Sequence, residues 1–229
     1  MLVLALDTTT REGSCALARD GRVLREQGSD ASKPQASRLP GDLVTLLEQE
    51  GVTLPKIDVY AVASGPGSFT GLRVGIATMQ GLAFAAGKPL IGISALDALH
   101  AHAQGQVHMH RAQVATWIDA WRGEIYAALY ENGIEVEPPS VAHPDDLLPR
   151  FAGRPTLFIG DATATHAAAI GAALGDLATI ADPVMPLLAG TIARLATAAA
   201  LAGQLPPPHA IRPLYVRRLD SELLPKRAV

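Results

Sequence analysis

Apolar and polar positions in the first half of the chain predict three strands, followed by helices and strands in alternation. Apolar runs of strand length cover residues 3–6, 14–19 and 22–27. Asp20-Gly21, between the second and third runs, is a strong two-residue hairpin signal. Leucines at helical spacing predict a helix over 36–50, which Gly51 ends. The pattern continues with a strand over 58–63, an apolar helix over 72–86 and a strand over 90–93.

The second half begins with the same order of elements. Three strands are predicted again, over 114–119, 124–130 and 134–136. Asn132-Gly133 is the hairpin signal before the third of them. Asp7, at the end of the first strand of the chain, is as far from Gly21 as Asp119 is from Gly133. This coincidence indicates an internal duplication of one unit that begins with a meander.

Landmarks are sparser toward the end of the chain. The further elements expected there are a short helix, a strand and two alanine-rich helices, over 144–150, 156–159, 161–174 and 187–202. A stiff proline linker at 206–208 precedes the segment 212–218, which we expect to return to the first domain. The predicted domains are therefore 1–104 and 105–208, with 209–229 packing back on the first.

Composition narrows the class of protein. Of the 229 residues, 48% are hydrophobic and 18% are charged, which suits a folded chain with a large core. The net charge is −3, so there is no overall basic footprint for nucleic acid. A single cysteine, Cys15, excludes an intrachain disulfide and favours a reducing compartment. With no secretory signal and no segment long enough to span a bilayer, we expect a cytoplasmic protein without membrane contact.

A glycine-rich turn joins the strand over 58–63 to the apolar helix. It is not a GxxxxGK[ST] phosphate loop, because no lysine follows Gly71, and it is not GxGxxG, because Thr70 occupies the third glycine position. Ser68 and Thr70 suit the cap of the following helix. A tight turn with a good helix cap is therefore the simplest interpretation of this segment.

Five segments together resemble the TsaB family: LALDTTT, GPGSFTGLRVG, PLIGISALDAL, IDAWRGEIYAALY and RPLYVR. The motif residues in the glycine turn are Gly65, Pro66, Gly67, Ser68, Phe69, Thr70 and Arg73. The landmarks run from Leu4 to Arg217. The resemblance implies two actin-like, ribonuclease H-like βββαβαβα domains, with mixed five-stranded sheets flanked by helices. It also implies a non-catalytic partner of TsaD in making threonylcarbamoyladenosine on transfer RNA.

Asp7 and the three threonines after it, Thr8, Thr9 and Thr10, occupy the place where actin-like proteins hold a metal-bound phosphate. The alternative is that Asp7 caps the turn and its carboxylate accepts backbone N–H groups. The second phosphate loop would be 119–123, where Trp121 and Arg122 are too bulky for close approach. The adenosine loop would contain Gly160-Asp161, and that acid opposes a triphosphate. We therefore expect a vestigial phosphate loop, no cofactor and no catalytic residue.

Histidines offer no convincing metal site. TsaD relatives bind a metal through HxxxH, but Ala95 and Leu99 stand at those positions. His100, His102, His108 and His110 lie in what reads as a polar spacer without a neighbouring carboxylate or cysteine at ligand spacing, and we expect them to be exposed. Cys15 lies within a predicted strand and is expected in the core. The family's usual histidine before the first helix is missing from 33–40, so its role does not transfer.

The helix over 72–86 is apolar nearly all round, which is typical of a helix buried on both sides. It could lie between the sheet and the second domain, or it could meet another protein. The resemblance implies pairing with TsaD through helices of the first domain. The expected partner-binding residues are Leu39, Leu43, Leu46, Leu47, Gly71, Leu72, Val74, Gly75, Ala77, Thr78 and Gly81.

The hypothesis is therefore a scaffold and activator that joins TsaD, and TsaE in a larger complex, with transfer RNA contacted only indirectly. A homodimer is expected when the partner is absent. The alternatives are a small-molecule kinase or metal-dependent transferase of the same fold, or a stand-alone homodimer.

Overall fold

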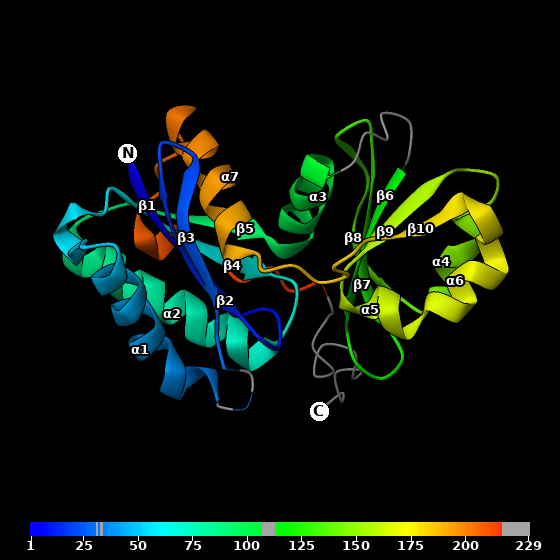
Figure 1. Cartoon of the computed structure of the whole chain (residues 1–229), viewed down its shortest axis with the longest axis horizontal. Helices are drawn as coiled ribbons and strands as arrows, with labels where there is room; N and C mark the ends of the chain where they lie inside the picture. Colours follow the sequence, from blue (N-terminus) through cyan, green and yellow to red (C-terminus); the bar gives the residue numbers. More distant parts are fainter. Residues whose placement is uncertain (31, 33, 107–112, 217–229) are drawn as a thin grey trace, which may run out of the picture.

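The computed structural model describes residues 1–216 apart from 31, 33 and 107–112. It contains two five-stranded sheets, with strand orders β3-β2-β1-β4-β5 and β10-β9-β6-β7-β8 (Figure 1). The first sheet consists of β1 Leu2–Asp7, β2 Ser14–Arg19, β3 Arg22–Gly28, β4 Val59–Gly65 and β5 Leu90–Ser94. The second consists of β6 Gln113–Asp119, β7 Ile125–Glu131, β8 Ile134–Ala142, β9 Thr156–Ile159 and β10 Ala178–Ile180.

The two sheets have the same topology, which confirms the predicted duplicated actin-like fold. In each sheet the first three strands form an antiparallel meander, and the last two add in parallel beside the first. Both predicted hairpins are present. Asp20 and Gly21 have φ values of 52° and 80°, and Asn132 and Gly133 have 51° and 82°. Positive φ at both central positions is the geometry that matches strand twist in a two-residue hairpin.

Alternation along β1 divides the core of the first half into two layers. Leu2, Leu4 and Leu6 pack toward α1 Gln35–Gln49 and α2 Phe69–Ala86. Val3 and Ala5 point to the opposite face, which is covered by α3 Ala95–Gln106 and α7 Ala189–Leu201. Successive strand residues face opposite sides of a sheet, so this central strand is buried on both faces.

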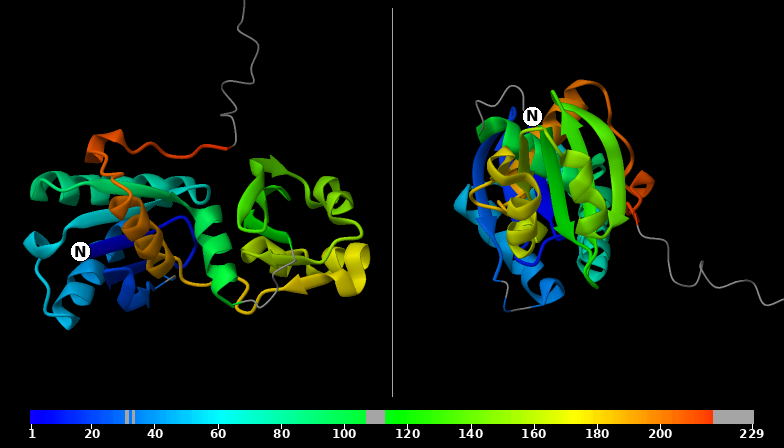
Figure 2. Two further views of the ribbon diagram at one scale, coloured as in Figure 1. Left: turned by 90° about the horizontal axis from the view of Figure 1, so that it is seen from above. Right: turned by 90° about the vertical axis from the view of Figure 1, so that its right-hand side faces the viewer.

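Helix α3 lies between the two sheets and contacts β4 and β5 on one side and β6, β7 and β9 on the other (Figure 2). The far face of the second sheet is covered by α4 Pro144–Leu147, α5 Asp161–Thr165 and α6 Ala167–Leu174. Trp117 on β6 fills the centre of this layer, with its ring 5.1 Å from that of Phe158 in an edge-to-face arrangement.

Helix α7 packs on the first sheet, not on the second domain to which the sequence analysis assigned it. The predicted division at 208 assigned this segment to the second domain, but α7 packs against β1, β2 and β4 of the first sheet. Side chains of that sheet hold its N-terminus. The Ser14 hydroxyl accepts hydrogen bonds from the Leu188 and Ala189 amides at 3.3 and 3.0 Å, and Glu26 accepts from the Gly190 amide at 2.7 Å. These bonds satisfy amides that have no partner within the helix.

The segment after α7 returns along the first half, as the sequence predicts. The Leu90 amide donates to the Pro206 carbonyl at 3.2 Å, and the Leu214 amide donates to the Ser64 carbonyl at 2.7 Å. Gln80 on α2 donates to the Pro208 carbonyl at 3.0 Å. The rest of the predicted returning segment, 217–229, lies outside the described residues. Among the described helices none is long and apolar enough to cross a membrane.

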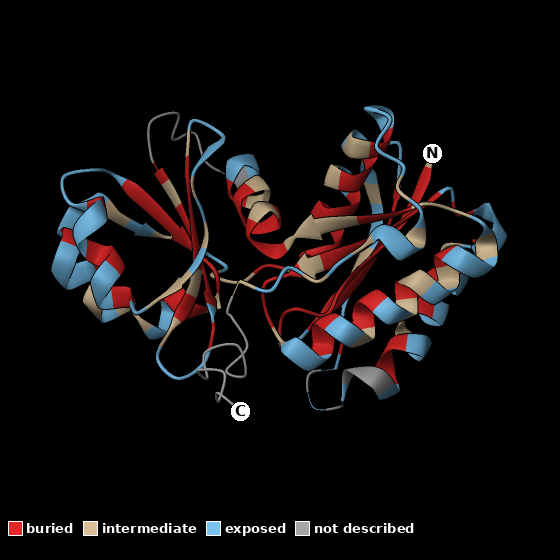
Figure 3. Cartoon of the chain, turned by 180° about the vertical axis from the view of Figure 1, so that it is seen from behind, coloured by how far each residue is buried: buried red, intermediate tan, exposed pale blue. Residues whose placement is uncertain are grey.

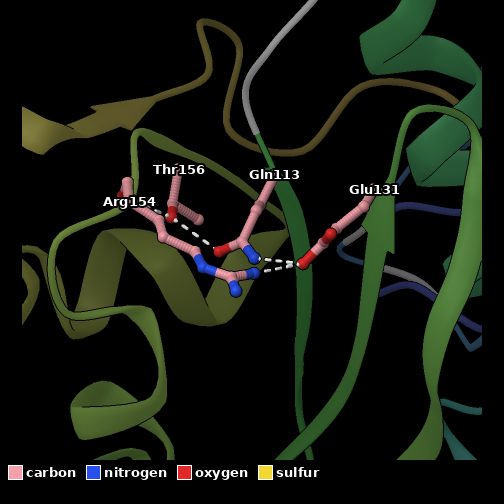
Figure 4. A network of polar contacts seen from close by, with 4 residues as sticks. All are labelled: Gln113, Glu131, Arg154 and Thr156. Atoms are coloured by element: carbon pink, nitrogen blue, oxygen red, sulfur yellow. Dashed lines mark hydrogen bonds and ion pairs between the residues drawn. The ribbon is translucent and has the colours of Figure 1, made fainter.

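A polar network closes one end of the second sheet (Figure 4). Glu131 on β7 accepts from the Gln113 side-chain amide and from Arg154, the latter at 2.6 Å. The Thr156 hydroxyl is 3.5 Å from the Gln113 side-chain oxygen. The network joins β6, β7 and β9 at the edge where β6 begins.

Candidate functional site

A cleft of about 1090 Å³ lies between the two halves. Its first wall is formed by the loop after β1, by Arg38 on α1 and by the start of α2. Its second wall contains Asp119, Trp121 and Asp161, and residues 185–187 complete it. Of the expected vestigial phosphate loop, Thr9 and Thr10 line this cleft, whereas Asp7 and Thr8 are not among its lining residues.

Asp7 is buried behind the first wall and caps its own turn. Its carboxylate accepts hydrogen bonds from the Thr9 amide at 2.8 Å, the Thr9 hydroxyl at 2.5 Å and the Thr10 hydroxyl at 2.9 Å. Burial raises the pKa of Asp7, while these hydrogen bonds act in the opposite direction. Thr9 and Thr10 line the cleft, but the Asp7 carboxylate accepts its hydrogen bonds from residues of its own loop. The turn-capping interpretation of Asp7 is confirmed.

Thr8 packs against the glycine-rich turn and the start of α2 and is hydrogen-bonded there. Its hydroxyl donates to the Gly71 carbonyl at 2.8 Å, and a Cβ added to Gly75 would lie 2.1 Å from the Thr8 Oγ1. A Cβ added to Gly67, which has φ of 151°, would lie 2.5 Å from the Thr9 carbonyl oxygen. These two glycines therefore allow the loop after β1 to pack against α2, which is a structural use of the motif.

The other motif residues organise the start of α2. The Ser68 hydroxyl accepts from the Gly71 amide at 3.2 Å, so Ser68 is the helix cap and α2 begins at Phe69 rather than at 72. The Arg73 guanidinium lies 3.9 Å above the Phe69 ring and donates through Nε to the Tyr215 hydroxyl at 3.0 Å. The returning C-terminal segment is thus joined to the family motif through one arginine.

The second wall of the cleft is acidic. Asp161 accepts from the Asp119 amide at 2.9 Å, and Asp119 accepts from the Trp121 amide at 2.8 Å. Burial raises the pKa of the Asp161 carboxyl, and the Asp119 charge adds to the effect. Gly160, in the expected adenosine loop, allows close packing, because a Cβ added there would lie 2.0 Å from the Trp117 carbonyl oxygen. Acids on this wall repel a triphosphate.

The prediction that the histidines occupy an exposed spacer is wrong for His100. Residues 95–106 form α3, in which His100 is buried and stacks on Tyr130 at 3.9 Å with an interplanar angle of 5°. The Tyr130 hydroxyl donates to Asp97 at 2.7 Å, so this cluster joins α3 to β7 of the second sheet. Burial lowers the pKa of His100. His102 is half-buried, whereas His108 and His110 lie outside the described residues.

Ala95 and Leu99 are buried in the apolar core that contains α3. Within the part of the chain that the structure describes, there is no group of three or more His, Cys, Asp or Glu residues able to hold a metal ion. Cys15 is in the core on β2, as predicted, and burial raises the pKa of its thiol to about 12.

The expected partner-binding residues fall into two groups. Seven lie buried within this chain and are not available on its surface: Leu39, Leu43, Leu46, Leu47, Gly71, Leu72 and Gly75. Their helical spacing marks the faces of α1 and α2 that pack on the sheet. Val74 and Thr78 are half-buried, and Ala77 and Gly81 are exposed. The interpretation of α2 as a helix covered on both sides is therefore not supported.

The exposed face of α2 forms what we call the outer stripe: Thr70, Arg73, Ala77, Gly81, Phe84 and Ala85. Figure 3 shows buried and exposed positions alternating along this helix at the edge of the first half. Phe84 is 80% exposed, and Val44 on the neighbouring α1 is 53% exposed. Neither was among the expected partner-binding residues, although a Phe beside Ala77, Gly81 and Ala85 on one helix face was a signal in the sequence.

Arg38 is a third residue that sequence reasoning missed. It is only 7% exposed, and its Nη2 donates to the Arg11 carbonyl at 3.1 Å. Its Nε and Nη1 are buried without a hydrogen-bond partner. The signal available in the sequence was that Arg38, a charged residue, directly precedes Leu39, the first leucine of the apolar face of α1.

The chain matches the family model of TsaD, tRNA N6-adenosine threonylcarbamoyltransferase, over residues 28–204. It is 30% identical to the tRNA threonylcarbamoyladenosine biosynthesis protein TsaB of Bacillus subtilis, covering 76% of this chain and 77% of that protein. It is 40% identical to the protein of that name in Escherichia coli, over 58% of each chain. An uncharacterized protein of Mycobacterium leprae is 31% identical over 96% of this chain, which spans 56% of that longer relative.

Solved structures agree with these sequence relatives. YeaZ from Pseudomonas aeruginosa superposes with a TM-score of 0.75 at 29% identity, covering 93% of this chain and 99% of that one. The activator of 2-hydroxyisocaproyl-CoA dehydratase from Clostridium difficile superposes with a TM-score of 0.55 at 11% identity, over 89% of this chain and 97% of that one. The second likeness concerns the fold alone.

Proposed function

Because the chain belongs to the TsaB family, we propose that it is a non-catalytic scaffold and activator in the complex that makes N6-threonylcarbamoyladenosine in transfer RNA. In this proposal it forms a heterodimer with TsaD and joins TsaE in a larger complex in the cytoplasm. Transfer RNA is contacted only through these partners. In the absence of TsaD, the chain associates with itself through the same surface.

The observation that carries the proposal is Gly81 on the outer stripe. A Cβ added there would meet nothing within 4 Å, so the glycine is not required by packing inside this chain. A glycine in an exposed helix interior costs about 1 kcal/mol relative to alanine. Beside it lie Ala77 and the largely exposed Phe84. Small residues that let a second helix come close, next to an apolar side chain that can insert into it, suit a helix of a partner protein.

The filled phosphate loop supports the non-catalytic part of the proposal. The Thr8 hydroxyl is used by Gly71, and the Asp7 carboxylate is used by Thr9 and Thr10. A kinase of this fold needs such groups directed at a nucleotide. The acids Asp119 and Asp161 on the opposite wall also disfavour a triphosphate. These contacts favour a binding subunit over the small-molecule kinase or metal-dependent transferase.

The test is complex formation with the TsaD of the same organism, measured by light scattering after gel filtration. We expect a heterodimer for the wild type and a self-associated form without TsaD. Ala77→Glu, which adds a charge to the outer stripe, should abolish both while leaving the circular dichroism spectrum unchanged. Ala168→Glu is the matched control, because Ala168 is an exposed alanine on α6 of the other half.

Retained binding of the folded Ala77→Glu variant to TsaD would contradict the proposed surface. Calorimetry with ATP tests the non-catalytic part separately. Micromolar or tighter binding of ATP by the isolated chain would favour the kinase alternative. Self-association without any binding to TsaD would favour the stand-alone homodimer.

A further inference from the structure

We propose that the cleft between the two halves binds a small oxyanion, a phosphate or a carboxylate group, with Arg38 as its counter-charge. The site goes beyond the proposed function, because that function uses the outer stripe of α2 and leaves the cleft without a role.

The first argument is the unsatisfied guanidinium of Arg38. A guanidinium carries five N–H donors. One nitrogen, Nη2, donates to the Arg11 carbonyl at 3.1 Å, while the buried Nε and Nη1 have no hydrogen-bond partner. No acid among the described residues forms an ion pair with Arg38. A buried charge without compensation is strongly destabilising. An oxyanion supplies both the missing charge and the missing acceptors.

The second argument is the position of Arg38 on the cleft wall. Ser68, Thr70 and Gly71, at the start of α2, line the same wall. The N-terminus of this 18-residue helix carries a partial positive charge and favours anions. Arg38, Arg11 and the helix N-terminus therefore place positive groups on one side of the cleft, where the only acid among the described lining residues is Glu12. Val74 and Leu187 also line it, and apolar surroundings strengthen the attraction.

The opposite wall limits the ligand. Asp119 and Asp161 line the cleft there, and a polyphosphate that extends across the cleft would approach both carboxylates. A ligand with one compact anionic group can instead remain beside Arg38. Since phosphate and carboxylate both present oxygens that match a guanidinium, the two sources must be separated by experiment.

The experiment measures the melting temperature of the full chain in sodium phosphate, sodium acetate or sodium chloride at equal ionic strength. We expect a saturable rise with phosphate or acetate beyond that with chloride. The rise should be lost in Arg38→Leu and kept in Arg22→Leu, which removes an exposed arginine of β3 outside the cleft. Saturation by phosphate alone identifies a phosphoryl ligand, and saturation by acetate alone identifies a carboxylate.

Fluorescence gives a second readout that does not depend on the folding of Arg38→Leu. Trp121 lines the cleft and is half exposed, so binding there should change its emission with the same midpoint as the thermal shift. The change should disappear in Trp121→Phe. The proposal is overturned if neither anion saturates beyond chloride, if folded Arg38→Leu keeps the shift, or if the wild-type emission does not respond.

Discussion

Replacing Gly81 by leucine should stabilise the isolated chain and weaken its complex with TsaD. Leucine is a far better helix former than glycine, and the exposed helix offers room, because nothing lies within 4 Å of the added Cβ. We expect a gain of about 0.5–1 kcal/mol in the free energy of unfolding. For a chain of this size, 1 kcal/mol corresponds to about 2–4 °C in Tm.

The same side chain should act in the opposite direction at the interface. If a partner helix packs closely over Gly81, leucine forces it away, and overpacking of this kind costs about 1–3 kcal/mol. Since 1.4 kcal/mol is tenfold in affinity, the Kd should rise by roughly 5-fold to 150-fold. Calorimetric titration against TsaD measures the Kd, and thermal denaturation measures the stability of the isolated chain.

Gly171→Leu is the matched control for this experiment. Gly171 is an exposed glycine within α6 of the other half, and a Cβ added there also meets nothing within 4 Å. This variant should gain stability in the same way and bind TsaD like the wild type. Equal affinities of the Gly81→Leu and Gly171→Leu variants for TsaD would refute the reasoning.

Two further predictions concern the chain's own stability. Ser14→Ala removes the acceptor for two amides at the start of α7, so urea denaturation should show a loss of about 1–3 kcal/mol; Ser140→Ala, on exposed β8, should cost little, and equal costs would argue against this cap. Burial raises the pKa of Asp7 from 3.8, so the folded state holds this proton more tightly than the unfolded state, and the contribution falls as pH rises through the folded-state pKa. The unfolding free energy of the wild type minus that of Asp7→Asn should therefore decrease as the pH rises above the unfolded-state pKa of 3.8; a difference that grows with pH would contradict the assigned direction.

Local signals in the sequence were sufficient for the duplication and for nine of the ten strands among the described residues, but the three-residue strand β10 was not predicted. Asp20-Gly21 and Asn132-Gly133 specify their hairpins because positive φ at both positions is a property of the dipeptide itself. Leucine spacing found α1 and its buried face, but periodicity marks burial without naming the surface that buries it. Leu39 and Leu43 were therefore assigned to a partner, although their own sheet covers them.

Features that depend on distant residues could not be predicted in this way. Helix α3 was not predicted, because its histidines read as polar, whereas His100 is buried and stacks on Tyr130, which is 30 positions later in the chain. The start of α7 is held by a hydrogen bond from the Ala189 amide to the Ser14 hydroxyl, and these two residues are 175 positions apart in the sequence. Whether the Arg38 nitrogens find hydrogen-bond partners depends on the loops that surround the side chain in the folded structure. The spacing of residues along the chain does not predict those surroundings.

The route of α7 also constrains how the chain is made. During synthesis the strands of the first sheet emerge early, but the helix that covers one of their faces is completed only at Leu201. Until then α3 covers this face only at β4 and β5, and the part of β1 and β2 that will meet Ile192, Ala193 and Ala196 is open. A nascent chain that stops at the boundary between the sheets is thus left with an open apolar face. The packing of the first half is therefore completed by a late segment, and a fragment ending near residue 104 would lack the helix that covers this face of its sheet.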